Sequence, residues 1–268
     1  MSKTPQQPRR RVRSEPLVVA FAAAGSLLML FVLLPLCTTL LGTPLSDVWS
    51  LLSDRQAVSA LTLTFYAAAW ATVLALFTGV PLAYLLARFE FPGKRWVEGA
   101  VNLPIVVPHT AAGIALLMVF GRRAALGAAL GRLGLTFVDT TAGIVVGMLF
   151  VSVPFLVNAA REAFELVDPE LERMAQTQGA SRWQAFRYIT LPLALRGILA
   201  GALVMWGRAI SEFGAVVILA YHPKIMPVLV FERFEGFGLA AAQPLALLLI
   251  VASLLVFVLL QTLLARGR

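Results

Sequence analysis

The sequence predicts an all-α integral membrane protein with six transmembrane helices and a helix–turn–helix loop on the cytoplasmic side. Of its 268 residues, 59% are hydrophobic and 13% are charged, whereas a soluble domain carries about 25% charged residues. The apolar residues gather in runs longer than the ~18 residues expected of a membrane-spanning helix. One long, polar and amphipathic segment, LERMAQTQGASRWQAFRYITLP, interrupts these runs and predicts the loop.

Membrane spans in this chain must be helices, because lipid offers the backbone no hydrogen-bond partner. The short alternating segments of a membrane β-barrel are not seen in the sequence. The second run is long enough to tilt or to extend past the bilayer. The predicted spans cover residues 17–42, 58–87, 99–121, 138–160, 197–220 and 239–265.

Orientation follows from the distribution of lysine and arginine. With the N-terminus in the cytoplasm, fifteen of the 22 basic residues fall inside, six fall outside, and Arg208 lies within a span. This bias predicts that both termini are cytoplasmic, although three arginines between the third and fourth spans oppose it. The net charge of +8 therefore indicates orientation and contact with membrane lipid, and we expect no nucleic-acid partner.

The first apolar run is predicted to be an uncleaved span of the plasma (inner) membrane. It is preceded by residues 1–16, a basic tail that we expect in the cytoplasm. A signal peptide has the same order of basic and apolar residues, but its apolar part is shorter than this run. The chain is therefore predicted to be a multi-pass membrane protein.

The polar loop covers residues 161–196, and its first half predicts a short helix. Asp168 suits the N-cap and Pro169 the first helical position. Glu170 and Glu172 would lie near the positive end of the helix dipole. One face of this helix would carry Leu171, Met174, Ala175 and Gln178.

The second half of the loop predicts another short helix. Gly179 is placed to end the first helix in a left-handed conformation. Ser181 and Gln184 form a capping-box pattern that opens the next helix, and Pro192 is predicted to end it. Simple connections between spans are short, whereas two capped helices with an apolar edge are typical of a docking surface for a soluble partner.

The loop resembles the cytoplasmic coupling motif of ABC importer permeases, in which E-A-A is followed by three residues, a glycine, nine residues and I-x-L-P. Nine residues separate Gly179 from Ile189-Thr190-Leu191-Pro192, which matches the glycine and the tail of that motif. The front end departs from it. Arg173-Met174-Ala175 occupies the E-A-A positions, and the nearest acid, Glu172, comes one residue early.

Further segments resemble the permease subunits of molybdate/tungstate ABC importers, within the oxyanion-importing group. They are VPHTAAGIALL in the third span and ISEFGAVV at the end of the fifth. The resemblance implies that two copies of the chain form a translocation pathway and that two copies of a separate ATPase each receive one coupling helix. It also implies an extracytoplasmic molybdate/tungstate-binding protein and ATP-driven alternating access.

The same resemblance assigns the loop residues to coupling with the ATPase. The chain has no G-x-x-x-x-G-K-[ST] phosphate loop, so we expect it to be no enzyme and to bind no cofactor. ATP and magnesium would be used by the partner ATPase. The predicted coupling residues are Asp168, Glu170, Leu171, Glu172, Met174, Ala175, Gly179, Ala180, Ser181 and Pro192.

Arg208 and Glu212 are the charged residues deepest within a predicted span, four positions apart on one helix face. Charges inside a membrane are costly and indicate function. They could line the pathway or form a self-neutralising pair that packs helices. The packing role is favoured, because Glu212 would repel an anion if both residues faced the pore.

Two prolines disturb the third span near its inner end, Pro104 and Pro108. His109 follows them, and we expect it to satisfy carbonyl groups freed by the prolines rather than to contact substrate. The candidates for the translocation pathway or for helix packing are Pro104, Pro108, His109, Arg208, Ser211 and Glu212.

Charged residues also lie at the two faces of the membrane. On the outer face, the segment YHPKIMPVLVFERFEG predicts a short helix that closes the pathway or contacts the binding protein. Its candidate residues are His222, Lys224, Glu232 and Arg233. On the inner face, the basic residues of a tight turn, Arg88, Lys94 and Arg95, are predicted to serve topology and lipid contact.

Other functions remain open. A sulfate/thiosulfate-type ABC permease is the main alternative, because molybdate, tungstate and sulfate are all tetrahedral dianions and the binding protein is expected to make most of the selection. A secondary transporter would also combine several spans with a buried ion pair. A membrane enzyme is disfavoured, since the two histidines are scattered and no acidic metal cluster is present in the sequence.

Overall fold

The computed structural model describes residues 16–266, and every regular element in that range is a helix. The chain divides into two units, Met1–Leu45 and Ser46–Arg268, which are described separately. The first unit contains α1 (Pro16–Gly42). The remaining elements are α2 (Leu45–Leu51), α3 (Arg55–Arg88), α4 (Lys94–Val106), α5 (His109–Phe120), α6 (Ala125–Arg132), α7 (Thr141–Glu165), α8 (Pro169–Thr177), α9 (Arg182–Ala185), the π-helical turn η1 (Phe186–Thr190), α10 (Leu191–Ile210), α11 (Gly214–Leu219), α12 (Met226–Phe237) and α13 (Leu239–Arg266).

α1 is apolar along its whole length, as a membrane span requires. Its hydroxyl groups are satisfied within the helix: Thr38 and Thr39 donate to the carbonyl of Pro35 at 2.9 and 2.8 Å. Lipid would offer these hydroxyls no partner. α1 thus has the length and the internal hydrogen bonding of a transmembrane helix.

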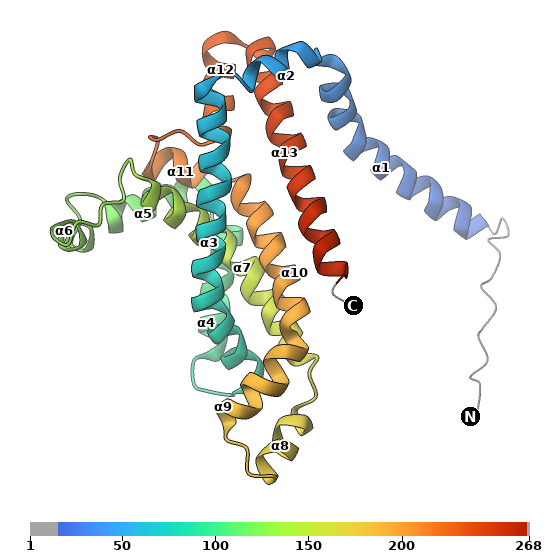
Figure 1. The fold of residues 1–268 in the computed structure, drawn as a ribbon, viewed down its shortest axis with the longest axis vertical. Coiled ribbons are helices and arrows are strands. Elements are labelled where there is room, and N and C mark those ends of the chain that lie inside the picture. The colour runs from blue at the N-terminus through green and yellow to red at the C-terminus, as the bar shows by residue number, and fades with distance from the viewer. Residues whose placement is uncertain (1–15, 267–268) are drawn as a thin grey trace. The chain divides into compact units, whose positions relative to one another are not determined.

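α3, α7 and α10 run side by side and form the core of the second unit (Figure 1). Gly197 and Gly201 of α10 face Ala163 and Ala159 of α7, and a methyl group at either glycine would overlap those alanines. Small residues at such positions let membrane helices approach closely and gain van der Waals contact. The buried face of α3 is likewise built mainly of small residues: Ala57, Ala60, Thr64, Ala67, Ala68, Ala71, Thr72, Ala75, Gly79 and Ala83.

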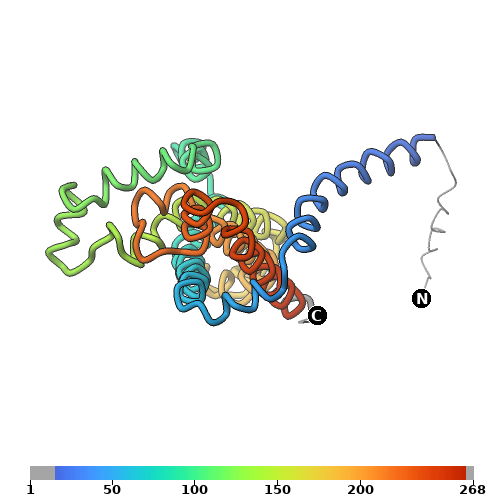
Figure 2. The backbone as a smooth tube through the Cα atoms, turned by 90° about the horizontal axis from the view of Figure 1, so that it is seen from above, coloured from blue at the N-terminus to red at the C-terminus, as the bar shows by residue number. Residues whose placement is uncertain are grey.

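Residues 99–121 do not form the single span that the sequence predicts. α4 and α5 meet at an angle of 117°, with Pro104 inside α4 and Pro108 at the N-cap of α5. The break has a clear cause, because proline lacks the backbone N–H that would continue the helix and restricts the residue before it. α5 and α6 consequently extend to one side of the bundle (Figure 2).

The predicted span at 197–220 is also wrong at both of its ends. A continuous helix runs from Arg182 to Ile210, and residues 211–213 separate it from α11. Pro192 does not end a helix. It is the second residue of α10. Leu191, which lies between η1 and Pro192, donates its N–H to the carbonyl of Phe186, so the missing N–H falls next to the point where the hydrogen-bond register changes.

Among residues 16–266, five helices are long and apolar enough to cross a membrane, and α4 with α5 brings the number to six if the pair counts as one broken span. This confirms the predicted all-α membrane fold. Within the second unit, α8 and α9 lie at one end of the bundle and α2 and α12 at the other (Figure 1).

Candidate functional site

Two regions carry the candidate functional residues, and the first is a protrusion formed by α8, α9 and η1 (residues 168–190). The Asp168 carboxylate accepts the N–H of Glu170 at 2.9 Å. Gly179 ends α8 with a φ of +93°, in the region that favours glycine. Ser181 and Gln184 cap α9 reciprocally at 3.2 and 2.7 Å. The caps and the left-handed glycine predicted from the sequence are therefore present.

Glu172 fastens this protrusion to the end of α3. Its Oε1 accepts hydrogen bonds from Arg88 Nε at 3.0 Å and from Thr190 Oγ1 at 2.6 Å. Its Oε2 accepts one from the Tyr84 hydroxyl at 3.2 Å, and Arg88 Nη2 also donates to the Val167 carbonyl at 2.7 Å. The side chains of Arg88 and Glu172 are 8% and 12% exposed. A buried charge pair of this kind is tolerated because each partner also makes hydrogen bonds beyond the pair itself.

Neither role was anticipated from the sequence. Arg88 was expected to serve topology, and Glu172 was treated as an acid in the first turn of a helix. The two residues are 84 positions apart, so no local pattern joins them. The sequence did contain one relevant feature, a basic residue at the end of a predicted span. If a polar segment folds over such a residue, the buried charge needs a carboxylate partner.

The outer surface of the protrusion is partly apolar. Leu171, Met174, Trp183 and Tyr188 are all exposed. A shallow hollow of about 390 Å³ lies between α8 and α9 and is lined by Ala175, Gln178, Gly179, Ala180, Gln184, Ala185, Tyr188 and Ile189. Exposed apolar side chains beside a hollow form a surface suited to a protein partner. Glu170 pairs with Arg173 at the exposed start of α8, and Pro192 lies beyond the protrusion, in α10.

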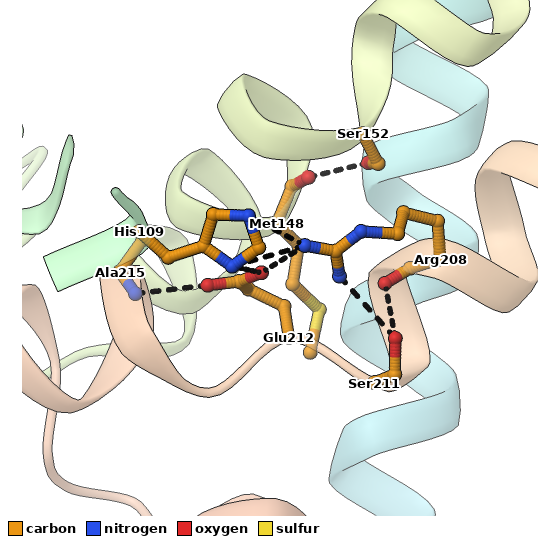
Figure 3. Close-up of polar contacts among 7 residues, drawn as sticks. All are labelled: His109, Met148, Ser152, Arg208, Ser211, Glu212 and Ala215. Atoms are coloured by element: carbon orange, nitrogen blue, oxygen red, sulfur yellow. Dashed lines mark hydrogen bonds and ion pairs between the residues drawn. The ribbon is translucent and has the colours of Figure 1, made fainter. Parts of the chain in front are cut away.

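The second region is a charged cluster of His109, Arg208, Ser211 and Glu212, where α5, α10 and α11 meet (Figure 3). Arg208 Nη2 lies 3.0 Å from Glu212 Oε2, and 3.0 and 2.9 Å from the two ring nitrogens of His109. His109 Nδ1 lies 3.2 Å from Glu212 Oε2. Arg208 Nη1 donates to Ser211 Oγ at 3.2 Å. An imidazole, a carboxylate and a hydroxyl thus converge on Arg208, although His109 is 99 positions away in the sequence.

Glu212 is the buried member of the charged cluster. It is fully buried as a residue, and its Oε1 accepts the N–H of Ala215 at 2.9 Å. An ionised carboxylate in such a place must be paired and hydrogen-bonded. Arg208, His109 and the Ala215 N–H supply those partners.

Two glycines make this arrangement possible. A Cβ atom at Gly214 would lie 2.7 Å from the Cβ of His109, and one at Gly113 would lie 2.8 Å from the Cβ of Ile218. The absence of side chains at both positions lets α5 and α11 touch. That contact carries His109 across to Glu212.

The structure joins residues that the sequence treated separately. Arg208 and Glu212 were predicted to pair at i and i+4, and they do. His109 was expected to satisfy freed carbonyls, but its ring nitrogens contact Arg208 and Glu212 instead. Pro104 is buried within α4 and Pro108 begins α5, so the prolines create the break that presents His109.

A polar ladder between α4 and α7 was missed. Arg161 Nη1 contacts Glu98 Oε1 at 2.8 Å, and Asn158 Nδ2 donates to Asn102 Oδ1 at 2.7 Å. Arg161 also pairs with Glu165 at 2.7 Å. Asparagines inside apolar spans were the available signal, because an amide in lipid needs a partner on a neighbouring helix.

The predicted outer residues are connected around one pocket. His222 and Lys224 line a pocket of about 580 Å³ together with Arg55, Gln56, Ser59, Ala60 and Pro223. Lys224 Nζ donates to Glu232 Oε1 at 2.8 Å, and Arg233 Nη2 donates to Gln56 at 3.2 Å.

Comparison with known proteins shows which proteins this chain is similar to. The family model described as "binding-protein-dependent transport system inner membrane component" matches residues 79–266. A molybdate/tungstate transport system permease protein WtpB of Thermococcus kodakarensis is 42% identical over 258 residues, which are 95% of this chain and 99% of that protein. The WtpB of Pyrococcus furiosus is 41% identical, covering 96% and 98%.

A solved structure shares the fold. A bacterial ABC transporter involved in the import of the acidic polysaccharide alginate superposes with a TM-score of 0.74 at 16% identity, covering 93% of this chain and 95% of that one. The family match extends over most of the chain and includes the protrusion and the charged cluster. The chain therefore belongs to the family of binding-protein-dependent transport system inner membrane components, and it is a multi-pass membrane permease.

Proposed function

We propose that this chain is the membrane-spanning subunit of an ATP-driven importer of molybdate or tungstate. Two copies would form the translocation pathway, and two copies of a separate ATPase would dock on their protrusions. The names of two relatives, 42% and 41% identical to this chain, support the substrate class. The shared fold with a transporter of the ABC type supports the division of labour between subunits.

One observation carries the coupling proposal. The helix Arg182–Ile210 begins in the protrusion and ends at the charged cluster without interruption. At 1.5 Å per residue it spans roughly 40 Å. A partner that moves Trp183 at one end therefore moves Arg208 at the other, because a packed helix transmits displacement along its axis.

The anchor at Glu172 makes this transmission efficient. It ties α8 to both α3 and η1, so the protrusion moves together with two long helices. Closure of an ATPase dimer would bring two protrusions together and open the pathway outward, and hydrolysis would return it inward. This is rigid-body alternating access, driven by the difference in ATP binding between two states.

The remaining assignments follow from the same proposal. The protrusion and both termini would face the cytoplasm, where the ATPase uses ATP and magnesium while this chain binds no cofactor. An extracytoplasmic binding protein would deliver the anion to the opposite end of the bundle. His222, Lys224, Glu232 and Arg233 at that end would contact the binding protein or close the outer mouth.

A permease for sulfate or thiosulfate is the alternative within this class. Molybdate, tungstate and sulfate share a tetrahedral shape and a double negative charge, so the same donors would bind all three. Uptake measured with each anion decides between these substrates. A secondary transporter would show uptake without ATP.

The proposal is tested by measuring whether the ATPase of the same transport system binds to the purified chain. The variant Ala175→Asp/Gly179→Pro places a charge in the hollow and a ring with φ near −65° where φ is +93°. We expect it to lose the ATPase in co-purification. The matched control is Gly236→Ala, whose added methyl meets nothing within 4 Å. If the double variant keeps the ATPase while its circular dichroism matches that of the control, the protrusion is not the docking surface.

A further inference from the structure

We propose that Arg208, His109 and Ser211 form a weak binding subsite for a tetrahedral oxyanion, with Glu212 as the buried counter-charge that positions the arginine. This inference rests on the proposed transport function and assigns its substrate class to particular atoms. It also resolves the choice between a pathway role and a packing role for the ion pair in favour of the pathway.

The first step is the exposure of the four side chains. The Glu212 side chain is 1% exposed, whereas those of Arg208 and His109 are 21% and 39% exposed. Ser211 is exposed as well. An anion approaching the charged cluster therefore meets the donors first and the carboxylate last. The objection that Glu212 would repel an anion does not hold, because its carboxylate is buried and is paired with Arg208 and His109, as Figure 3 shows.

The second step is the set of hydrogen-bond donors that Arg208 and Ser211 offer to an anion. A guanidinium carries five N–H groups in a planar fork. Glu212 and His109 engage the Nη2 side of this fork, and Ser211 holds Nη1. The Ser211 hydroxyl donates to the Arg208 carbonyl at 2.9 Å, and it can turn to donate to an anion instead. Arginine forks and hydroxyls are donors that suit tetrahedral oxyanions.

The third step is the strength of the site. Glu212 neutralises much of the charge on Arg208, so the cluster attracts a dianion weakly. A transit site needs this property, since an ion must leave as readily as it enters. A fully unpaired arginine would hold the anion and slow its release.

The fourth step is that the cluster is a poor device for packing alone. Replacing a buried ion pair by apolar side chains is often neutral or stabilising. Charged groups within membrane helices are costly and mark transport pathways. Arg208 also lies in the last turn of the helix that starts in the protrusion, so a change at the ATPase alters the geometry of the same donors.

The test uses the chain reconstituted in vesicles with its ATPase and binding protein. The double variant Arg208→Gln/Glu212→Gln keeps the polar contacts and the net charge of the pair but removes the cation. We expect molybdate uptake lowered about tenfold, as for the loss of a charge-assisted hydrogen bond, and co-purification of the ATPase checks that the variant complex assembles. If uptake stays within about twofold of wild type, the pair only packs helices and the subsite proposal is wrong.

A second measurement does not depend on the variant folding. Diethylpyrocarbonate modification of His109 is followed by mass spectrometry in the wild-type complex, with His222 as the internal reference. We expect tungstate to slow modification at His109 relative to His222, and equal ionic strength of chloride to leave the ratio unchanged. An unchanged ratio in tungstate overturns the subsite. Failure of the wild-type complex to take up any oxyanion with ATP would overturn the transport proposal instead, which keeps the two outcomes distinct.

Discussion

Replacing Glu172 by alanine removes the carboxylate that joins the protrusion to α3. Arg88, whose side chain is 8% exposed beside Glu172, then keeps its hydrogen bond to the Val167 carbonyl. Breaking one side of a buried ion pair costs roughly 3–5 kcal/mol. We expect about 3 kcal/mol in the free energy of unfolding, the lower end of that range, because the Val167 carbonyl still accepts one hydrogen bond.

The conservative variant separates charge from geometry. Glu172→Gln keeps one oxygen that can accept from Arg88 and Thr190, and its amide N–H can donate to the Tyr84 oxygen that donated to the carboxylate before. We therefore expect a loss of about 1 kcal/mol, comparable to one hydrogen bond. The matched control is Glu170→Ala on the same helix. Glu170 forms an exposed pair with Arg173, and such pairs contribute below about 1 kcal/mol.

The assay is reversible unfolding of the purified chain in mixed micelles, combined with hydrogen exchange of the α8 amides. We expect Glu172→Ala to speed exchange throughout α8 and to lower ATP-driven uptake. The Arg88→Ala/Glu172→Ala cycle should show a coupling free energy above about 1 kcal/mol. The reasoning is refuted if Glu172→Ala and Glu170→Ala lose the same stability, or if the coupling free energy is zero.

Three further predictions concern packing and charge. Gly201→Leu should destabilise the α7–α10 contact by about 1–3 kcal/mol, because even a methyl group added at Gly201 would overlap an alanine of α7. Thermal unfolding measures this loss, and an unchanged midpoint would contradict it. Gly214→Val should push α11 away from α5, because the Cβ of the valine would lie 2.7 Å from the Cβ of His109. Diethylpyrocarbonate should then modify His109 faster, and an unchanged rate would count against the contact between the two helices. The hydrogen bond from Lys94 holds the pKa of Glu90 below its ordinary value of 4.5. The contribution of this bond to the stability of the fold is therefore full above pH 4.5 and is lost as pH falls through the lowered pKa. Lys94→Met should return that pKa toward 4.5, as followed by carboxyl chemical shifts, and no movement would exclude the bond.

Local chemistry in the sequence was sufficient for the caps of the protrusion. Asp168, Gly179 and Ser181 each act within three residues of themselves, so their roles can be predicted from spacing alone. The apolar runs likewise predicted membrane helices, because hydrophobic length is a property of a single segment. These parts required no knowledge of tertiary contacts.

The breaks and the long-range contacts could not be predicted in this way. Pro192 was expected to stop a helix, but η1 absorbs its missing N–H, and a π-helical turn leaves no signal in residue spacing. Pro108 does break a helix, yet the 117° angle depends on the glycines that let α5 meet α11. The contacts of His109 with Glu212 and of Arg88 with Glu172 join distant parts of the chain, so only the folded structure brings them together.

ATP-driven molybdate uptake in vesicles that contain the chain, its ATPase and its binding protein tests the central claim most directly. The account predicts that uptake requires ATP and all three proteins. It also predicts that Ala175→Asp/Gly179→Pro abolishes this uptake, whereas Gly236→Ala preserves it. Uptake that proceeds without ATP or without the ATPase would contradict the account and would favour a secondary transporter built around Arg208 and Glu212.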